Sequence, residues 1–384
     1  MRNGWQRKTL DEISVNLDSR RVPITKAVRT SGEYPYYGAS GIVDYVADYI
    51  FDEDTLLISE DGANLLARST PIAFPASGKY WVNNHAHILK FDNTTTQRFV
   101  ELYLESIPLD NFVKGAAQPK LTQKALNSIP IPVPALSEQQ RIVSILDQAF
   151  KGIATAKANA EQNLLNARIL FESHLQSVFT QRGPGWVEKR LGDLAQFKNG
   201  LNFTRQSKGQ TLRMVGVGGF QNNTVVPTES LQSVTIDGDL SDEYLIRRDD
   251  ILTVRSNGSK DLVGRCMLVP EVDGKISYSG FIIRMRFDSR ELHPHFLLRF
   301  MKSSGTRERL TRDGGGTNIS NINQAKLSEL PIFLPPFDRQ EDIANSLDKL
   351  SAETQRLESI YQQKLAALEA LKKSLLDQTF SGKL

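Results

Sequence analysis

The sequence predicts an α+β fold in which two related α/β domains are separated by two long helices that form an antiparallel coiled coil, with a pseudo-two-fold internal repeat. Three observations predict it: one segment recurs after 201 residues, another recurs after 181 residues, and two stretches of equal length show a sustained helical period. The 384 residues include 40% hydrophobic and 24% charged side chains, an ordinary globular composition that excludes disorder and collagen-like structure.

The segment that recurs after 201 residues joins a proline-rich run to the start of a helix. Its first copy reads Ile129-Pro-Ile-Pro-Val-Pro134, then Glu138-Gln-Gln-Arg-Ile142 and Leu146-Asp147, and its second copy reads Leu330-Pro-Ile-Phe-Leu-Pro335, then Arg339-Gln-Glu-Asp-Ile343 and Leu347-Asp348. The second copy keeps Gln340 but moves the acidic residue by two positions, which argues against a role for the Glu138 side chain.

The start of the chain recurs after 181 residues, where Gly4-Trp5 and Leu10 match Gly185-Trp186 and Leu191. The two repeats together divide the chain into four parts: a domain over residues 1–135, a helix over 136–181, a second domain over 182–336 and a second helix over 337–384. Each domain alternates short apolar runs with turn residues, so we expect strands and loops with a few helices, such as 97–106 and 295–303.

The two long helices are predicted from apolar or small residues at steps of three and four. These are Ile142, Leu146, Ala149, Ile153, Ala156, Ala160, Ala167, Leu170 and Phe171 in the first helix, and Ile343, Leu347, Leu350, Leu357, Tyr361, Leu368, Leu371 and Leu375 in the second. We expect Ser137 and Asp338 as N-caps. An alanine-rich seam facing a leucine-rich one favours pairing of the two helices with each other; the alternative is that they are core helices of two separate domains.

The net charge of +3 is too small for a protein that coats nucleic acid through bulk charge. Residues 1–135 carry 14 basic and 15 acidic side chains, whereas residues 182–335 carry 22 and 17, so positive charge is concentrated in the second domain. The single cysteine, Cys266, forms no internal disulfide, and no signal-peptide core or apolar run of membrane-spanning length is found. We therefore expect a soluble, cytoplasmic chain.

No set of residues in the sequence points to catalysis. A phosphate-binding P-loop is absent, and Val217-Gly-Gly-Phe220 and Gly314-Gly-Gly316 are expected to be turns. Leu334-Pro-Pro-Phe337 resembles the Asn-Pro-Pro-Phe of adenine methyltransferases but has leucine where the amide is required. His85 and His87 could bind a metal from one face of a strand, but without further ligands we expect packed or hydrogen-bonding histidines.

Two similar domains on a rigid spacer suit the reading of two separated features of an extended partner. Double-stranded DNA is the obvious candidate, because half-sites one helical turn apart lie about 35 Å from each other. The alternatives are a structural adaptor that holds protein partners and a stand-alone enzyme, and the second is disfavoured because the sequence has no nucleophile, metal or cofactor motif.

The chain resembles the specificity subunit (HsdS) of type I restriction-modification systems over almost its whole length. The resemblance rests on the two boundary segments and the two domain starts described above. It also rests on Tyr36-Tyr-Gly-Ala-Ser-Gly-Ile42, Ile58-Ser-Glu-Asp-Gly62, Asn84-His-Ala-His87, Gly115-Ala-Ala-Gln-Pro-Lys-Leu121, Arg255-Ser-Asn-Gly-Ser259 and Val263-Gly-Arg265.

The resemblance implies that residues 1–135 and 182–336 are target recognition domains, each reading half of a bipartite, asymmetric DNA sequence. The helices would space these domains and dock two methyltransferase (HsdM) subunits, and restriction (HsdR) subunits would join the assembly. The chain would have no catalysis, metal or cofactor of its own, because S-adenosylmethionine, ATP and Mg²⁺ would be bound by the partners.

We expect DNA contacts from amide, hydroxyl and basic side chains in the loops, since such groups match base edges and phosphates. In the first domain the candidates are Ser40, Asn64, Asn83, Asn84, His85 and Lys120. In the second domain they are Arg205, Lys208, Arg213, Arg255, Ser256, Asn257, Ser259, Lys260, Asn318, Ser320 and Asn321. Any one of them could instead belong to a solvated loop or a local Asx turn.

Overall fold

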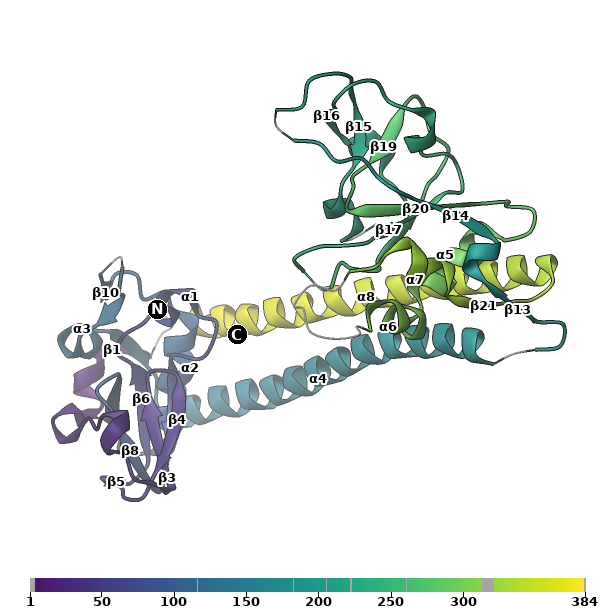
Figure 1. Cartoon of the computed structure of the whole chain (residues 1–384). Helices are drawn as coiled ribbons and strands as arrows, with labels where there is room; N and C mark the ends of the chain where they lie inside the picture. The colour runs from purple at the N-terminus through teal and green to yellow at the C-terminus, as the bar shows by residue number, and fades with distance from the viewer. Residues whose placement is uncertain are drawn as a thin grey trace. The chain divides into compact units, whose positions relative to one another are not determined.

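The computed structural model describes residues 4–115, 117–181, 183–204, 206–221, 223–259, 261–312 and 321–382. It divides into two compact units: unit 1 comprises Met1–Glu161 and Gln362–Leu384, and unit 2 comprises Gln162–Tyr361. The α+β fold and the two long helices are confirmed, and Figure 1 shows helix α4 (Leu136–Thr180) and helix α8 (Phe337–Phe380). Each unit contains part of both helices.

Unit 1 is built around two four-stranded sheets. One has the strand order β2 (Val15–Asn16), β9 (Ala86–Lys90), β6 (Thr55–Ser59), β7 (Ala73–Ala76), and the other has the order β4 (Gly41–Val46), β3 (Ser31–Gly38), β8 (Lys79–Val82), β5 (Phe51–Asp52). Two antiparallel pairs, β1 (Gln6–Thr9) with β12 (Pro130–Val133) and β10 (Val113–Lys114) with β11 (Lys120–Leu121), and the helices α1 (Asn64–Ala67), α2 (Thr94–Ser106) and α3 (Gln123–Asn127) complete the unit.

Unit 2 has the same plan. Its larger sheet has the order β14 (Ala195–Asn199), β20 (Ile282–Phe287), β17 (Ile251–Val254), β18 (Cys266–Leu268), and its smaller sheet has the order β16 (Gln232–Thr235), β15 (Thr211–Val215), β19 (Ile276–Tyr278). The pair β13 (Val187–Arg190) with β21 (Pro331–Leu334) and the helices α5 (Pro294–Lys302), α6 (Ser304–Thr311) and α7 (Gln324–Ser328) complete it. Figure 1 shows the smaller sheet at the end of this unit away from α5 and α7.

The repeat extends to regions where the two halves share no obvious sequence pattern. In each unit one parallel strand pair, β3 with β8 or β15 with β19, lies beside a sheet whose paired strands are antiparallel. The ladders at the domain boundaries also match, because Gln6 pairs with Val133 in unit 1 and Val187 pairs with Leu334 in unit 2. The same backbone is therefore built twice from different side chains.

The glutamine of the boundary motif explains why that motif recurs. Gln139 and Gln340 are 4% and 2% exposed, and their Nε2 groups donate to the carbonyls of Pro134 at 2.9 Å and Pro335 at 3.1 Å. Gln340 also accepts a bond of 2.9 Å from the amide of His293. Each glutamine thus fixes the proline-rich run against the first turn of the helix, which meets the backbone's need for partners at this buried corner.

The expected N-caps Ser137 and Asp338 are wrong, because α4 begins at Leu136 and α8 at Phe337. Both residues therefore lie inside the first helical turn. The residues that bind the preceding backbone are the two glutamines, which are amides further along the same turn.

The Leu-Asp step of the motif anchors each long helix to its own unit. Leu146 and Leu347 are buried in the core, at 0% and 1% exposure. The following aspartate binds an arginine of a neighbouring helix: Asp147 Oδ1 lies 2.7 Å from Arg98 Nη2, and Asp348 Oδ1 lies 2.7 Å from Arg299 Nη2. The two arginines are themselves 201 residues apart, so the repeat includes this ion pair.

Within each unit the two long helices contact each other. In unit 1 Lys157 Nζ lies 2.6 Å from Glu369 Oε1, and the Lys372 ammonium lies 5.5 Å from the centre of the Phe150 ring, so the helices run antiparallel there. In unit 2 Arg168 Nη2 lies 2.9 Å from Glu358 Oε2. No helix among the described residues combines the length and the apolar character that crossing a membrane requires.

The predicted seam is wrong at three leucines. Leu170, Leu357 and Leu371 are 61%, 40% and 47% exposed, although Leu146, Ala160 and Ala167 are buried as expected. A strict period of three and four overestimates the buried stripe because a two-helix contact covers a narrow face of each helix.

We predict that Gln340→Ala destabilises unit 2 by about 2–3 kcal/mol, because it leaves buried backbone groups without partners. Urea unfolding monitored by the fluorescence of Trp186, with Trp5 and Trp81 replaced by phenylalanine, measures the loss in this unit alone. Arg339→Ala is the matched control, since its side chain is 67% exposed in the same helical turn and the change should cost less than about 0.5 kcal/mol. Equal stabilities of the two variants would contradict the assignment.

Candidate nucleic-acid interface

Four chain segments of unit 1 meet where strands end, and we call them loop cluster 1: residues 38–40, 59–62, 83–85 and 119–121. Main-chain bonds hold them together. The Asn83 amide donates to the Tyr37 carbonyl at 3.0 Å, the Glu60 amide to the His85 carbonyl at 2.9 Å, and the Leu121 amide to the Glu60 carbonyl at 2.8 Å. Because the bonds come from the backbone, the side chains of the cluster are free to vary.

Unit 2 contains an equivalent set of segments, which we call loop cluster 2: residues 216–217, 255–259, 279–281 and 321–322. The Ser279 amide donates to the Val215 carbonyl at 3.0 Å, the Arg255 amide to the Phe281 carbonyl at 2.9 Å, and the Ile322 amide to the Arg255 carbonyl at 2.8 Å. Isolated bridges join Asp61 to Lys120 in unit 1 and Ser256 to Asn321 in unit 2. The bonds match one for one, so the two clusters share one backbone design.

The structure brings several of the predicted residues of the first domain into loop cluster 1. Ser40, Asn84, His85 and Lys120 are exposed there, and the Lys120 Nζ atom lies 3.1 Å from Glu60 Oε1. Asn83 is in the cluster but is only 7% exposed, and its Oδ1 accepts a 2.7 Å bond from the His85 amide.

The predicted residue Asn64 lies outside loop cluster 1 and serves its own turn. Its Nδ2 donates to the Thr70 carbonyl at 3.0 Å, and its Oδ1 accepts from the Ser69 hydroxyl at 2.9 Å. Asn83 and Asn64 therefore hold loops in place, which is the alternative that the sequence left open for such residues.

In unit 2 the predicted residues divide in the same way. Arg255, Ser256 and Asn257 are half-buried in loop cluster 2, where Ser259 and Asn321 are exposed. The exposed Lys208 lies outside the cluster, and so does Arg213, whose guanidinium donates to the carbonyls of Thr228 and Asp273. The candidates Arg205, Lys260, Asn318 and Ser320 lie outside the described residues.

Two residues of the clusters were not predicted from the sequence. Asp61 lies with its Oδ2 2.8 Å from His85 Nδ1 and orients that ring. Phe281 occupies in unit 2 the position that His85 occupies in unit 1, and it is 58% exposed. The signal that could have identified Phe281 is its place directly before an apolar run, as His85 stands directly before Ala86-His-Ile-Leu.

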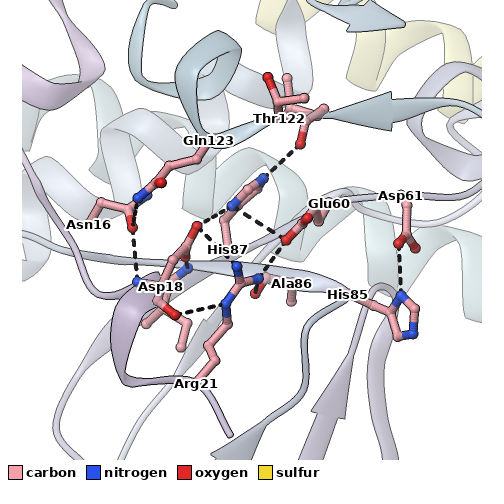
Figure 2. Close-up of polar contacts among 12 residues, drawn as sticks. Asn16, Asp18, Arg21, Glu60, Asp61, His85, Ala86, His87, Thr122 and Gln123 are labelled. Carbon is pink, nitrogen blue, oxygen red and sulfur yellow. Dashed lines mark hydrogen bonds and ion pairs between the residues drawn. The ribbon is translucent and has the colours of Figure 1, made fainter. Parts of the chain in front are cut away.

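A buried ionic network lies beside loop cluster 1, as Figure 2 shows. His87 is 1% exposed, with Nδ1 2.5 Å from Asp18 Oδ2 and Nε2 2.8 Å from the Leu121 carbonyl. Arg21 Nη1 lies 2.5 Å from Glu60 Oε2 and also donates to the Ala86 carbonyl at 2.9 Å. The network thus joins three parts of the unit: Asp18 and Arg21 near its start, Glu60 after strand β6, and Leu121 in strand β11.

Charge balance sets the ionisation of this network. Burial alone would raise the pKa of Asp18, but the bond from His87, the amide of Ile88 and the charge of Arg21 outweigh it and lower the pKa below its usual value. The pKa of Glu60 is lowered in the same way, because Arg21, His87 and Lys120 outweigh its burial. Both carboxylates are therefore ionised and paired at neutral pH.

The trio Asp18, Glu60 and His87 has the residue types and spacing of a metal site. Its ligand atoms already have partners, however, because both ring nitrogens of His87 are hydrogen-bonded and Arg21 binds the Glu60 carboxylate. A divalent ion would have to displace Arg21 from a site that is already neutralised. We interpret the trio as a structural network.

The only cysteine in the sequence is not placed as a nucleophile. Cys266 is buried on β18 with its Sγ 3.1 Å from the Thr253 hydroxyl. Burial raises the pKa of its thiol to about 11, so it is protonated at neutral pH.

We predict that Asp18→Asn destabilises unit 1 by about 2–4 kcal/mol at pH 7, because the Arg21 guanidinium and the buried His87 ring lose a carboxylate partner. The pKa of Asp18 is lowered on folding, so its stabilisation is complete above the unfolded-state pKa and is lost as the pH falls through the lower folded value. In urea unfolding from pH 7 to pH 3, the gap between wild type and variant should shrink in the acid range. The exposed Asp11→Asn is the control, and a gap independent of pH would contradict the interpretation.

Comparisons with known proteins agree with this architecture. Residues 2–166 and 184–369 match the family model for the type I restriction modification DNA specificity domain. The chain is 27% identical over 359 residues to a type I restriction enzyme specificity subunit assigned in Haemophilus influenzae, covering 90% of this chain and 88% of that one. It is 25% identical over 284 residues to the StySPI specificity subunit of Salmonella potsdam, covering 70% and 61%.

Solved structures share the fold. The HsdS subunit from Thermoanaerobacter tengcongensis aligns over 100% of this chain and 98% of its own length, with a TM-score of 0.63 and 17% identity. A chain from a structure on the assembly and conformational transition of a type I R-M system aligns with a TM-score of 0.75 and 16% identity, over 100% and 99%. Since the family model covers both repeats, the chain belongs to the type I restriction modification DNA specificity family, the non-catalytic specificity subunits of type I restriction-modification systems.

Proposed function

We propose that this chain reads a bipartite, asymmetric DNA target, with residues 1–135 and 182–336 as its two target recognition domains. Residues 136–181 and 337–384 would set the spacing between the half-sites. The observation that carries the proposal is the pair of loop clusters, which share a backbone hydrogen-bond pattern but differ in side chains. Reading two different half-sites requires the same backbone scaffold with different exposed groups, and the two clusters have this combination.

The differences at equivalent positions concern hydrogen-bonding groups. Asp61 corresponds to Ser256 and Lys120 to Asn321, as the two isolated bridges indicate. An ammonium donates only, whereas an amide both donates and accepts and can pair with adenine in the major groove. Two clusters with such different groups favour different bases, so we infer an asymmetric target.

The exposed and half-buried polar members of the clusters are our candidates for base and phosphate contacts. These are Ser40, Asn84, His85 and Lys120 in the first domain, and Arg255, Ser256, Ser259 and Asn321 in the second; the exposed Lys208, which lies outside the cluster, stays a candidate. Asn64, Asn83, Asn257 and Arg213 would act by holding their loops, because their polar groups already have protein partners. Arg205, Lys260, Asn318 and Ser320 stay candidates on the sequence alone.

In this proposal the catalytic work belongs to partners. Two methyltransferase subunits and restriction subunits would assemble with the chain, and S-adenosylmethionine, ATP and Mg²⁺ would be bound by them. One relative in structure comes from a study of complex assembly in a type I R-M system, which supports such partners here. We expect the assembly to work in the cytoplasm, where the DNA is.

The long helices offer the surface for this docking. Leu170 on α4 and Leu371 on α8 are 201 residues apart and are 61% and 47% exposed. Leu165 and Ile169 are exposed in the same stretch of α4, at 50% and 52%, and a group of exposed apolar side chains is typical of a protein contact. Equivalent leucines at repeat positions favour two equivalent docking sites, one for each methyltransferase subunit.

The decisive experiment is reconstitution of the chain with its methyltransferase subunit, followed by selection from random duplexes and mapping of the methylated adenines. We expect one sequence in two unequal parts with a fixed spacer. Failure to retain any sequence selectively would contradict the proposal and favour a structural adaptor.

We predict that the free chain binds its target weakly at physiological salt and that the methyltransferase subunits restore tight binding. The first domain has 14 basic against 15 acidic residues, so it neutralises few phosphates by itself. Gel-shift titrations of the chain with and without methyltransferase measure the difference, and nanomolar binding by the chain alone would contradict it.

We predict that Leu170→Asp and Leu371→Asp each remove one methyltransferase subunit from the assembly, and that the double variant removes both. Mass measurement of the purified complexes gives the stoichiometry. Asn345→Asp, at an exposed polar position of α8, is the control and should leave both subunits bound. Loss of both subunits from a single variant would contradict two independent sites.

A further inference from the structure

His85 and Phe281 occupy the same position in the two loop clusters. The His85 carbonyl accepts a 2.9 Å bond from the amide of Glu60, which follows strand β6. The Phe281 carbonyl accepts a 2.9 Å bond from the amide of Arg255, which follows strand β17. The amides of His85 and Phe281 are each bound by the side chain two residues earlier, at 2.7 Å by Asn83 and at 3.4 Å by Ser279. Each of the two residues directly precedes its strand, β9 or β20.

The turn that carries Phe281 is fixed in place. Gly200 packs so closely against it that an added Cβ would lie 2.3 Å from the carbonyl oxygens of Tyr278 and Ser279. The Gly280 amide donates to the Leu201 carbonyl at 2.7 Å. The Phe281 ring therefore projects from a rigid base although it is 58% exposed.

Phe281 lines a hollow of about 700 Å³ in unit 2. Phe203, Met214 and Asn257 also line the hollow. Gly216 and Gly218 border it with nothing within 4 Å of an added Cβ, so another molecule can approach the backbone there. Apolar side chains lie here next to the polar groups of loop cluster 2. This combination suits a ligand that carries an apolar group on an otherwise polar edge.

We propose that Phe281 is a specificity-determining residue that contacts the C5-methyl group of a thymine in the half-site of the second domain. The inference rests on the proposed DNA-reading function and deepens it. In the major groove thymine is the base that presents a methyl group, and apolar side chains are the groups that recognise it. An exposed phenyl ring has no hydrogen bond to offer a base edge, so the methyl group is the feature it can select.

The equivalent position in unit 1 has the opposite chemistry. His85 Nδ1 lies 2.8 Å from Asp61 Oδ2, and Figure 2 shows this pair beside the buried network. When the neutral ring donates Nδ1–H to the carboxylate, its Nε2 is an acceptor, which suits the amino group of adenine or cytosine. Asp61 is then a positioning residue, and one backbone position reads a methyl group in one half-site and an amino group in the other.

The test uses the full chain assembled with its methyltransferase subunit and duplexes carrying the selected target. Each thymine of the second half-site is replaced in turn by deoxyuridine, which removes only the methyl group. We expect one replacement to weaken wild-type binding about fourfold, the value of one buried methyl group. Phe281→Ala should bind the thymine duplex more weakly and show no thymine-to-uracil difference, whereas Phe281→Leu should keep it.

One further variant and a folding control complete the test. His85→Phe should create a preference for thymine in the first half-site, with melting temperature as the control for folding in every variant. Sequence-selective binding without a uracil-sensitive position, or with one that persists in Phe281→Ala, overturns this inference but leaves the proposed function intact. An assembly that selects no sequence at all overturns both.

Discussion

The main-chain bonds from Leu121 to Glu60 and from Ile322 to Arg255, each 2.8 Å long, are the contacts on which the rest of each unit depends. They attach the segment that leads into a long helix to the end of strand β6 in unit 1 and of strand β17 in unit 2. From there the chain passes through a short helix and the ladder with the first strand of the unit into the long helix, whose first turn contains the buried glutamine. The position of the loop cluster and the start of the helix are fixed by one stretch of backbone.

Beneath this shared backbone the two units are stabilised in different ways. The position of His87 in unit 1 corresponds to Ile283 in unit 2, and Asp18 corresponds to Asn199, whose Oδ1 is buried without a hydrogen-bond partner. Unit 1 thus has a buried ionic network where unit 2 has a buried isoleucine and an uncharged asparagine. Buried ion pairs and well-packed apolar residues can replace one another at similar stability, so the side chains below the loops vary as freely as those above them.

The sequence predicts the repeat and the long helices well because both depend on spacing and periodicity, which a linear pattern contains. It predicts the loop residues less well. Asn64, Asn83 and Arg213 have the right chemistry for DNA, but their hydrogen bonds are already used within the protein, and such partners become visible only when distant segments meet. Phe281 and Leu170 fail in the other direction, since an apolar side chain in a sequence suggests a core and both are exposed.

The burial of Cys266 has a practical consequence for the two loop clusters. Its protonated, enclosed thiol is the only one in the sequence and does not react readily with alkylating reagents at neutral pH. A cysteine introduced at the exposed Ser40 or Ser259 would therefore be labelled alone, without removal of the native one. A pair of such labels, one in each cluster, would allow the distance between the clusters to be measured by spectroscopy, both in the free chain and on DNA.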